Sequence, residues 1–88
     1  MVEVKKFGAS WCGPCRALAP ILSEVKSQYN NVSFVEHDVD DDFEEATKFG
    51  IRSVPTVVVL KDGVEVDRIV GLSSKLKYTN LINEQLAK

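Results

Sequence analysis

The segment Thr56–Leu60, which reads TVVVL, constrains the fold more than any other. Four consecutive apolar side chains in so short a segment predict a strand that is buried on both faces. Such a strand requires a sheet with a further layer packed on each side, and helical patterns elsewhere in the chain can supply those layers. The sequence therefore predicts an α/β fold.

The residues before this strand alternate between strand and helix patterns. Apolar and polar side chains alternate over 2–7, and apolar residues recur at helical spacing from 14 to 29. A second strand is expected over 32–39, and a short helix follows the acidic residues 40–42, whose charges suit a helix N-terminus. Pro20 interrupts the first helical pattern, but the apolar stripe continues, so a kink is expected rather than an end.

The residues after the buried strand predict a hairpin and a last helix. Asp62 and Gly63 form a tight-turn signal before a fourth strand over 64–70. Gly71 ends that strand, and Ser73 or Ser74 is expected to cap the helix. The order is βαβαββα, a four-stranded mixed sheet flanked by three helices in a single domain, 1–88. We expect these side chains to face the core from the last two helices: Phe43, Ala46 and Phe49, then Leu76, Leu81, Ile82 and Leu86.

Composition excludes several functional classes. The chain of 88 residues is 44% hydrophobic and 27% charged, which is typical of a folded globular domain rather than a disordered one. A net charge of −2 gives no attraction to nucleic acid or anionic membrane, and no apolar run approaches the ~20 residues of a membrane span. The N-terminus lacks the apolar stretch of a signal peptide, so we expect a cytoplasmic monomer.

The chain has two cysteines, Cys12 and Cys15, and they are separated only by Gly13 and Pro14. The pair follows the first strand and occupies the first turn of the first helix, where proline is well tolerated. Unpaired N–H groups and the positive end of the helix dipole favour a thiolate there, so we expect a lowered pKa for Cys12. One thiol of such a pair can attack a disulfide in a partner, and the other can resolve the mixed disulfide.

Other roles for the cysteines fit less well. A structural zinc site normally needs four ligands, and the two cysteines with His37, a lone histidine with no visible partner, supply three at most. A static disulfide would close a loop too short to stabilise much, and inert burial does not suit Cys12 beside Trp11. The acidic run from Glu36 to Glu45 lacks the glycine of a calcium loop. We therefore expect redox chemistry with no metal and no cofactor.

Four motifs together resemble the thioredoxin family over nearly the whole chain. They are WCGPC at Trp11–Cys15, the helix proline Pro20, GIRSVPT at Gly50–Thr56 and VGLSS at Val70–Ser74. The resemblance implies a thioredoxin-like fold and protein-disulfide reductase activity. It also implies that Cys12 is an exposed nucleophile and that Cys15 is a more buried resolving thiol.

The resemblance also implies a substrate groove beside the cysteines. Pro55 at the head of a buried strand cannot donate a ladder hydrogen bond, which by itself indicates an edge or a special turn. In thioredoxin-like proteins this proline follows a cis bond, so the backbone of Val54 is expected to meet an extended substrate strand. The remaining substrate-binding residues implied by the resemblance are Trp11, Gly13, Pro14 and Gly71.

The sequence departs from the family at three points. The usual first strand and helix are missing, which leaves an outline closer to glutaredoxin, and Gly8 stands where a tryptophan is usual. Lys6 replaces a buried aspartate, and Glu36 on the neighbouring strand replaces a lysine. We predict that these two charges meet in a partly buried pair behind the disulfide and tune the cysteine pKa values, because an uncompensated buried charge is costly. Alternatively, Lys6 extends its stem to solvent and touches neither thiol.

The leading functional hypothesis is a dithiol enzyme that reduces protein disulfides through Cys12 and Cys15 and is recharged by a thioredoxin reductase. One alternative is a glutaredoxin-like enzyme recharged by glutathione, which the short fold permits. A third hypothesis, from a different class, is a binding module whose thiols are incidental.

Overall fold

The structure, a computed structural model, describes residues 1–88 and contains seven elements in the predicted order. Each element lies within a few residues of its predicted position. The bounds are β1 Val2–Gly8, α1 Gly13–Ser27, β2 Val32–Asp38, α2 Phe43–Lys48, β3 Thr56–Lys61, β4 Val64–Val70 and α3 Lys75–Leu86.

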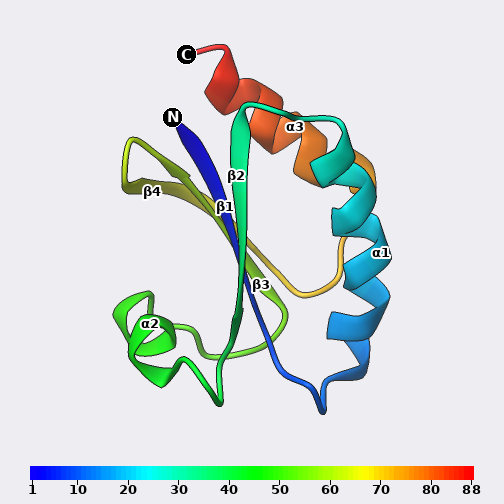
Figure 1. Ribbon diagram of the computed structural model, residues 1–88, viewed down its shortest axis with the longest axis vertical. Helices are drawn as coiled ribbons and strands as arrows, with labels where there is room; N and C mark the ends of the chain where they lie inside the picture. Colours follow the sequence, from blue (N-terminus) through cyan, green and yellow to red (C-terminus); the bar gives the residue numbers. More distant parts are fainter.

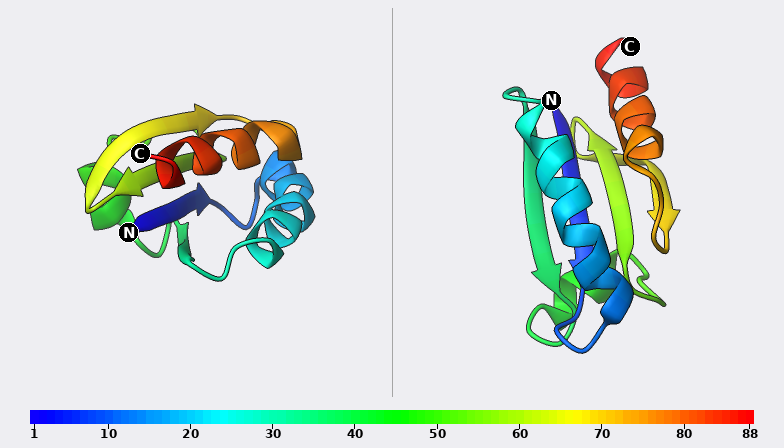
Figure 2. Two further views of the ribbon diagram at one scale, coloured as in Figure 1. Left: turned by 90° about the horizontal axis from the view of Figure 1, so that it is seen from above. Right: turned by 90° about the vertical axis from the view of Figure 1, so that its right-hand side faces the viewer.

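The four strands form one mixed sheet in the order β2-β1-β3-β4. β1 and β2 are parallel and β3 and β4 are antiparallel, as the pattern predicted. β1 also pairs antiparallel with β3, a neighbour that the sequence did not indicate. The hairpin turn between β3 and β4 has Asp62 at φ 52° and Gly63 at φ 84°, which suits a turn with two left-handed residues. Helices α1 and α3 lie side by side on one face of the sheet, and α2 lies on the other (Figures 1 and 2).

Two apolar clusters hold the layers together, one on each face of the sheet. The larger joins β1, β3 and Ile69 of β4 to α1 and α3, and the smaller joins Phe7, Val58 and Leu60 to Ala46 of α2. β3 sends Val57 and Val59 into the first cluster and Val58 and Leu60 into the second. The prediction that this strand is covered on both faces is therefore confirmed.

Three side chains expected in the core are exposed: Phe43, Leu76 and Leu86. Phe43 and Leu76 lie in the first turn of their helices and Leu86 in the last turn of α3, where the helix ends extend past the packed face. Tyr78 and Gln85 are buried on α3 instead, beside Leu81 and Ile82. Helical periodicity predicted the apolar stripe of each helix. The angle at which the helix docks decides which side chains of that stripe reach the sheet.

Helix α1 positions the cysteines. β1 ends at Gly8 and α1 begins at Gly13, so a short connection places Cys12 at the N-cap and Cys15 in the first turn. The helix continues through Pro20 to Ser27, as the apolar stripe predicted. None of the three helices is long and apolar enough to cross a membrane.

Candidate active site

Cys12 and Cys15 are joined in a disulfide whose Cα atoms are 5.3 Å apart. Cys12 is the N-cap of α1, and its Sγ accepts the backbone N–H of Cys15 at 3.2 Å. Pro14 occupies the first turn between them, where its missing N–H removes no helix hydrogen bond. The sulfur of Cys12 thus lies against the positive end of the helix, where a thiolate is stabilised.

The two cysteine residues are equally buried. Each cysteine residue is 5% exposed, so the expectation of an exposed Cys12 and a more buried Cys15 is wrong for the disulfide form. Their neighbours do differ: Cys12 Sγ lies 3.8 Å from the carbonyl oxygen of Val54, whereas Cys15 Sγ faces Gly8 at the end of β1. Cys12 is buried in a small cluster with Ala9 and Cys15, against which Val39 and Val54 pack.

The segment before β3 lies beside Cys12. The Val54–Pro55 peptide bond is cis, as the resemblance implied. The N–H of Gly71 donates to the carbonyl oxygen of Pro55 at 2.8 Å, which joins the loop after β4 to this segment. No atom lies within 4 Å of the position that a Cβ on Gly13 or Gly71 would take, so both glycines border open space.

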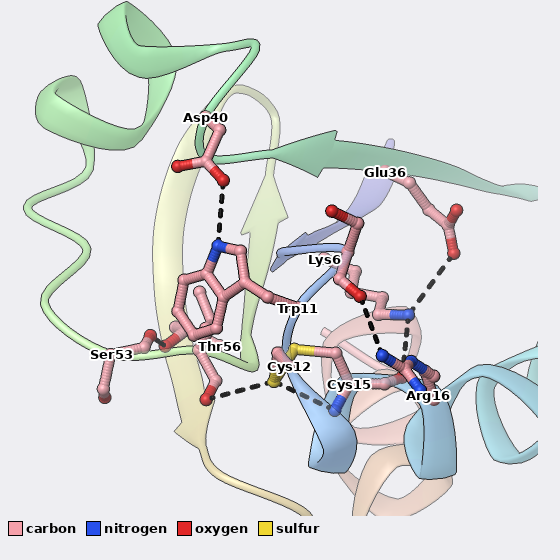
Figure 3. The surroundings of a disulfide bond; sticks show 11 residues. Lys6, Trp11, Cys12, Cys15, Arg16, Glu36, Asp40, Ser53 and Thr56 are labelled. Atoms are coloured by element: carbon pink, nitrogen blue, oxygen red, sulfur yellow. Dashed lines mark hydrogen bonds and ion pairs between the residues drawn. A yellow bond between two sulfur atoms is a disulfide. The ribbon is translucent and has the colours of Figure 1, made fainter.

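Trp11 precedes Cys12 in the chain and is exposed at the surface. Its side chain is 65% exposed, and its Nε1–H donates to Asp40 Oδ2 at 2.9 Å (Figure 3). Asp40 was expected only to favour the N-terminus of the second helix, and its contact with Trp11 was not predicted. The signal was available in the topology, because β1 and β2 are parallel and the residues that follow them meet at one edge of the sheet.

Lys6 and Glu36 are direct neighbours in the register of β1 and β2. The Lys6 Nζ lies 3.6 Å from Glu36 Oε1 and donates to the backbone oxygen of Cys15 at 3.4 Å. The side chain of Lys6 is 11% exposed and that of Glu36 is 75% exposed. The predicted contact is confirmed, but only the lysine is buried, and the alternative in which Lys6 extends to solvent is wrong.

His37 lies away from the cysteines. Its ring stacks on Phe7 with a centroid distance of 5.0 Å, and its Nδ1 contacts the Asp42 carboxylate. The expectation that this histidine has no partner is therefore wrong. No group of three or more His, Cys, Asp or Glu side chains in residues 1–88 is arranged to hold a metal ion.

A cysteine pair that closes a disulfide at a helix N-terminus, beside a cis-proline segment at the edge of a mixed sheet, defines a thiol–disulfide oxidoreductase with a thioredoxin-like fold. The thioredoxin family model matches residues 2–84. The chain belongs to the thioredoxin family, and it is a protein-disulfide reductase with the Cys12–Cys15 pair as its redox centre.

Individual relatives match over most of their own length. A thioredoxin of Chlamydia caviae is 41% identical over 78 residues, which cover 89% of this chain and 76% of that protein. A thioredoxin of Bacillus subtilis is 41% identical over 86 residues, covering 97% and 83%. The crystal structure of a thioredoxin from Nicotiana alata superposes with a TM-score of 0.90 at 37% identity, covering 96% of this chain and 72% of that one. The X-ray structure of Fasciola hepatica thioredoxin gives 0.89 at 38% identity, covering 96% and 80%.

Proposed function

We propose that Cys12 attacks the substrate and that Cys15 resolves the intermediate. The Cys12 thiolate attacks one sulfur of a protein disulfide, forms a mixed disulfide and releases the other substrate sulfur as a thiolate. The Cys15 thiolate then attacks Cys12 Sγ, which closes the Cys12–Cys15 disulfide and releases the second substrate thiolate. Two electrons pass to the substrate, and its two thiolates take up the two protons that the dithiol loses.

The observation that carries this assignment is the position of Cys12 Sγ at the N-cap of α1. It accepts the N–H of Cys15 at 3.2 Å, whereas Cys15 Sγ has no such donor among the hydrogen bonds of the site. A backbone N–H and the helix dipole stabilise a negative sulfur, so the Cys12 thiol is the better thiolate of the two.

The groove beside Cys12 is proposed to bind an extended segment of the substrate. The carbonyl oxygen of Val54 lies 3.8 Å from the sulfur, so a substrate strand paired to that backbone would bring its own disulfide to Cys12. Exposed Trp11 is one apolar side of this groove. The other residues that we assign to it are Gly13 and Gly71, which border open space, the exposed Pro14, and Pro55, whose side chain is buried and whose carbonyl oxygen accepts the N–H of Gly71.

Lys6 and Glu36 are proposed to shift the pKa values of the cysteine thiols. The Lys6 ammonium donates to the backbone oxygen of Cys15 at 3.4 Å, and both Lys6 Cε and Cys15 Sγ lie within 4 Å of the position that a Cβ on Gly8 would take. A cation this close favours a thiolate over a thiol, and the exposed carboxylate of Glu36 compensates the lysine charge only in part.

A thioredoxin reductase is the proposed electron donor, and glutathione is the alternative; recharging rates with each donor separate the two. Both cysteines come from one continuous stretch of one domain, so a monomer suffices for the cycle. We propose a cytoplasmic site of action, because reductants there keep dithiols available.

Trapping the mixed disulfide tests the assignment of roles. Cys15→Ser, which lacks the resolving thiol, is expected to accumulate a covalent adduct with a disulfide-containing protein such as insulin. Cys12→Ser, the matched control, is expected to give little adduct. Adducts are counted by intact mass after acid quenching, and a larger yield with Cys12→Ser would reverse the two roles.

A further inference from the structure

His37 is the one histidine of the chain, and its imidazole is almost enclosed by its neighbours. Its side chain is 12% exposed, and the ring stacks on the buried ring of Phe7 with 18° between the two planes. Nδ1 contacts the Asp42 carboxylate, whereas Nε2 is buried and has no hydrogen-bond partner. A buried polar atom without a partner is uncommon in folded proteins and calls for an explanation.

The contacts of this ring define where its protons lie. A carboxylate only accepts hydrogen bonds, so in the neutral ring the proton lies on Nδ1 and is donated to Asp42. A second proton goes to Nε2, which has no acceptor in its enclosed position. A buried charged donor without an acceptor is costly, so the protonated ring moves until its Nε2–H meets water or an oxygen atom. Protonation therefore changes the position of His37.

Charges of both signs surround the imidazole, and only Asp42 pairs with it. On α2, the pKa of Glu45 is lowered first by its hydrogen bond from Lys5 of β1 and, to a smaller extent, by the charge of His37. The remaining charged neighbours line one cavity together with His37: Glu36 and Asp38 from β2, Lys6 from β1 and Arg16 from α1. Carboxylates and cations nearly balance around the ring, so the missing acceptor at Nε2 decides how the ring responds to a proton.

Asp42 links His37 to a turn that reaches the active site. It is the N-cap of α2, but its side chain makes no capping hydrogen bond and faces His37 instead. The N–H of Asp42 donates to the carbonyl oxygen of Asp38 at 2.8 Å, and the N–H of the residue before it donates to the same oxygen, which makes the turn compact. Within this turn Asp40 accepts the Nε1–H of Trp11 at 2.9 Å (Figure 3). A displacement of Asp42 is therefore passed to Asp40 and Trp11.

We propose that His37 is a positioning residue for the substrate groove and that its protonation releases Trp11. With the neutral ring against Asp42, the turn holds Asp40 in place and the indole stays at the side of the groove. With the protonated ring displaced, the turn loosens and Trp11 loses its hydrogen bond. The inference rests on the proposed groove and adds to it a dependence on pH between about 5 and 8, where histidine ordinarily changes its charge.

The fluorescence of Trp11 tests this coupling without a redox step. Trp11 is the one tryptophan of the chain, and in the oxidised protein both cysteines lie in the disulfide and do not titrate. We expect the emission of the oxidised wild type to change in one step between about pH 5 and 8. His37→Gln, which can donate an N–H to Asp42 but takes up no proton, should keep the alkaline wild-type value throughout. A flat wild-type curve, or the same step in His37→Gln, would overturn the proposal.

Two alanine substitutions in the turn locate the link. Asp42→Ala removes the partner of His37, so the emission should take the acid wild-type value at every pH and show no step. Asp41→Ala is the matched control, because this exposed side chain of the same turn contacts neither His37 nor Trp11, and it should keep the wild-type step. Folding is checked by circular dichroism, and Asp42→Ala decides if His37→Gln does not fold. A step that persists in folded Asp42→Ala, or is lost in folded Asp41→Ala, contradicts the link.

The rate of substrate capture connects this coupling to function. Reduced Cys15→Ser, with and without His37→Gln, is mixed with a short peptide that contains one disulfide, and the adduct at Cys12 is followed by intact mass. Titration of the Cys12 thiol is common to both proteins and cancels in the ratio of their rates. We expect a ratio near one at about pH 8 and a twofold to tenfold advantage for His37→Gln at about pH 5.5, which corresponds to the loss of roughly one hydrogen bond in the protonated parent.

The possible failures are distinguishable. A ratio that stays at one in acid would show that His37 does not act on the groove and would overturn the proposal. No adduct in either protein would refute the proposed role of Cys12, and the fluorescence of the oxidised protein would still decide if His37 positions Trp11.

Discussion

Lys6 is a mostly buried, charged residue that contacts the backbone of a disulfide cysteine. Its stem crosses the apolar face that β1 shares with α1, and its ammonium contacts the backbone of Cys15 and the exposed carboxylate of Glu36. Alternation along β1 was enough to predict this contact, because neighbouring parallel strands put residues of one register pair on one face. The unequal burial of the two charges could not be predicted, because it depends on how closely α1 covers each strand.

Lys6→Met tests the effect of this charge on the thiols. Removing a cation beside Cys15 removes a favourable interaction with a thiolate, so the pKa of the Cys15 thiol should rise. The thiol is titrated by its absorbance or alkylation rate in the reduced Cys12→Ser protein. Lys26→Met, with an exposed lysine further along α1, controls for the change in net charge. Identical titration curves for Lys6→Met and its parent would contradict a tuning role.

Other residues of the site differ in how far the sequence predicted them. The cysteines and the cis proline segment were predicted, since WCGPC and SVPT are local motifs. The Trp11–Asp40 hydrogen bond joins residues 29 positions apart, and nothing in either local segment indicates it.

At the scale of elements, periodicity predicted the helices and strands but not all of their buried faces. Local spacing defines a stripe, and the buried part of that stripe depends on docking against the sheet. Helix α3 illustrates the difference, because Leu81 is buried beside Tyr78 whereas Leu76, in the first turn, is exposed.

Two alanine substitutions on α3 measure this difference. Leu81→Ala removes a buried side chain and leaves a cavity, so it should lower the free energy of unfolding by about 2–5 kcal/mol. Leu76→Ala makes the same chemical change at an exposed position and should alter it by no more than about 0.5 kcal/mol. Urea unfolding provides both values. Equal losses would contradict the placement of α3 on the sheet.

At the scale of the molecule, α2 is tied to the sheet by an ion pair as well as by apolar contacts. Lys5 of β1 donates to Glu45 of α2 at 3.0 Å, and its ammonium lies 5.5 Å from the centre of the Phe49 ring. The hydrogen bond from Lys5 holds the pKa of Glu45 below its usual value. The unfolded chain therefore takes up a proton at Glu45 more readily than the folded chain does.

This linkage predicts the pH dependence of one variant. The stabilisation by Glu45 is present above the ordinary glutamate value of 4.5 and is lost as the pH falls through the lowered pKa. Glu45→Gln should therefore be less stable than the parent at neutral pH, and the difference should shrink below 4.5. Thermal unfolding over this range measures it, with Glu44→Gln, a neighbouring exposed glutamate, as control. A difference that persists unchanged in acid would rule out the linkage.

The Cys12–Cys15 pair carries out protein-disulfide reduction. The most direct measurement is the reduction of insulin by dithiothreitol, followed as turbidity, with wild type and with Cys12→Ser. Wild type is expected to accelerate the reaction strongly, because the dithiol passes electrons to insulin and is regenerated by dithiothreitol. Cys12→Ser is expected to give the rate of dithiothreitol alone. If Cys12→Ser reduces insulin as fast as wild type, the cysteine pair is not the redox centre.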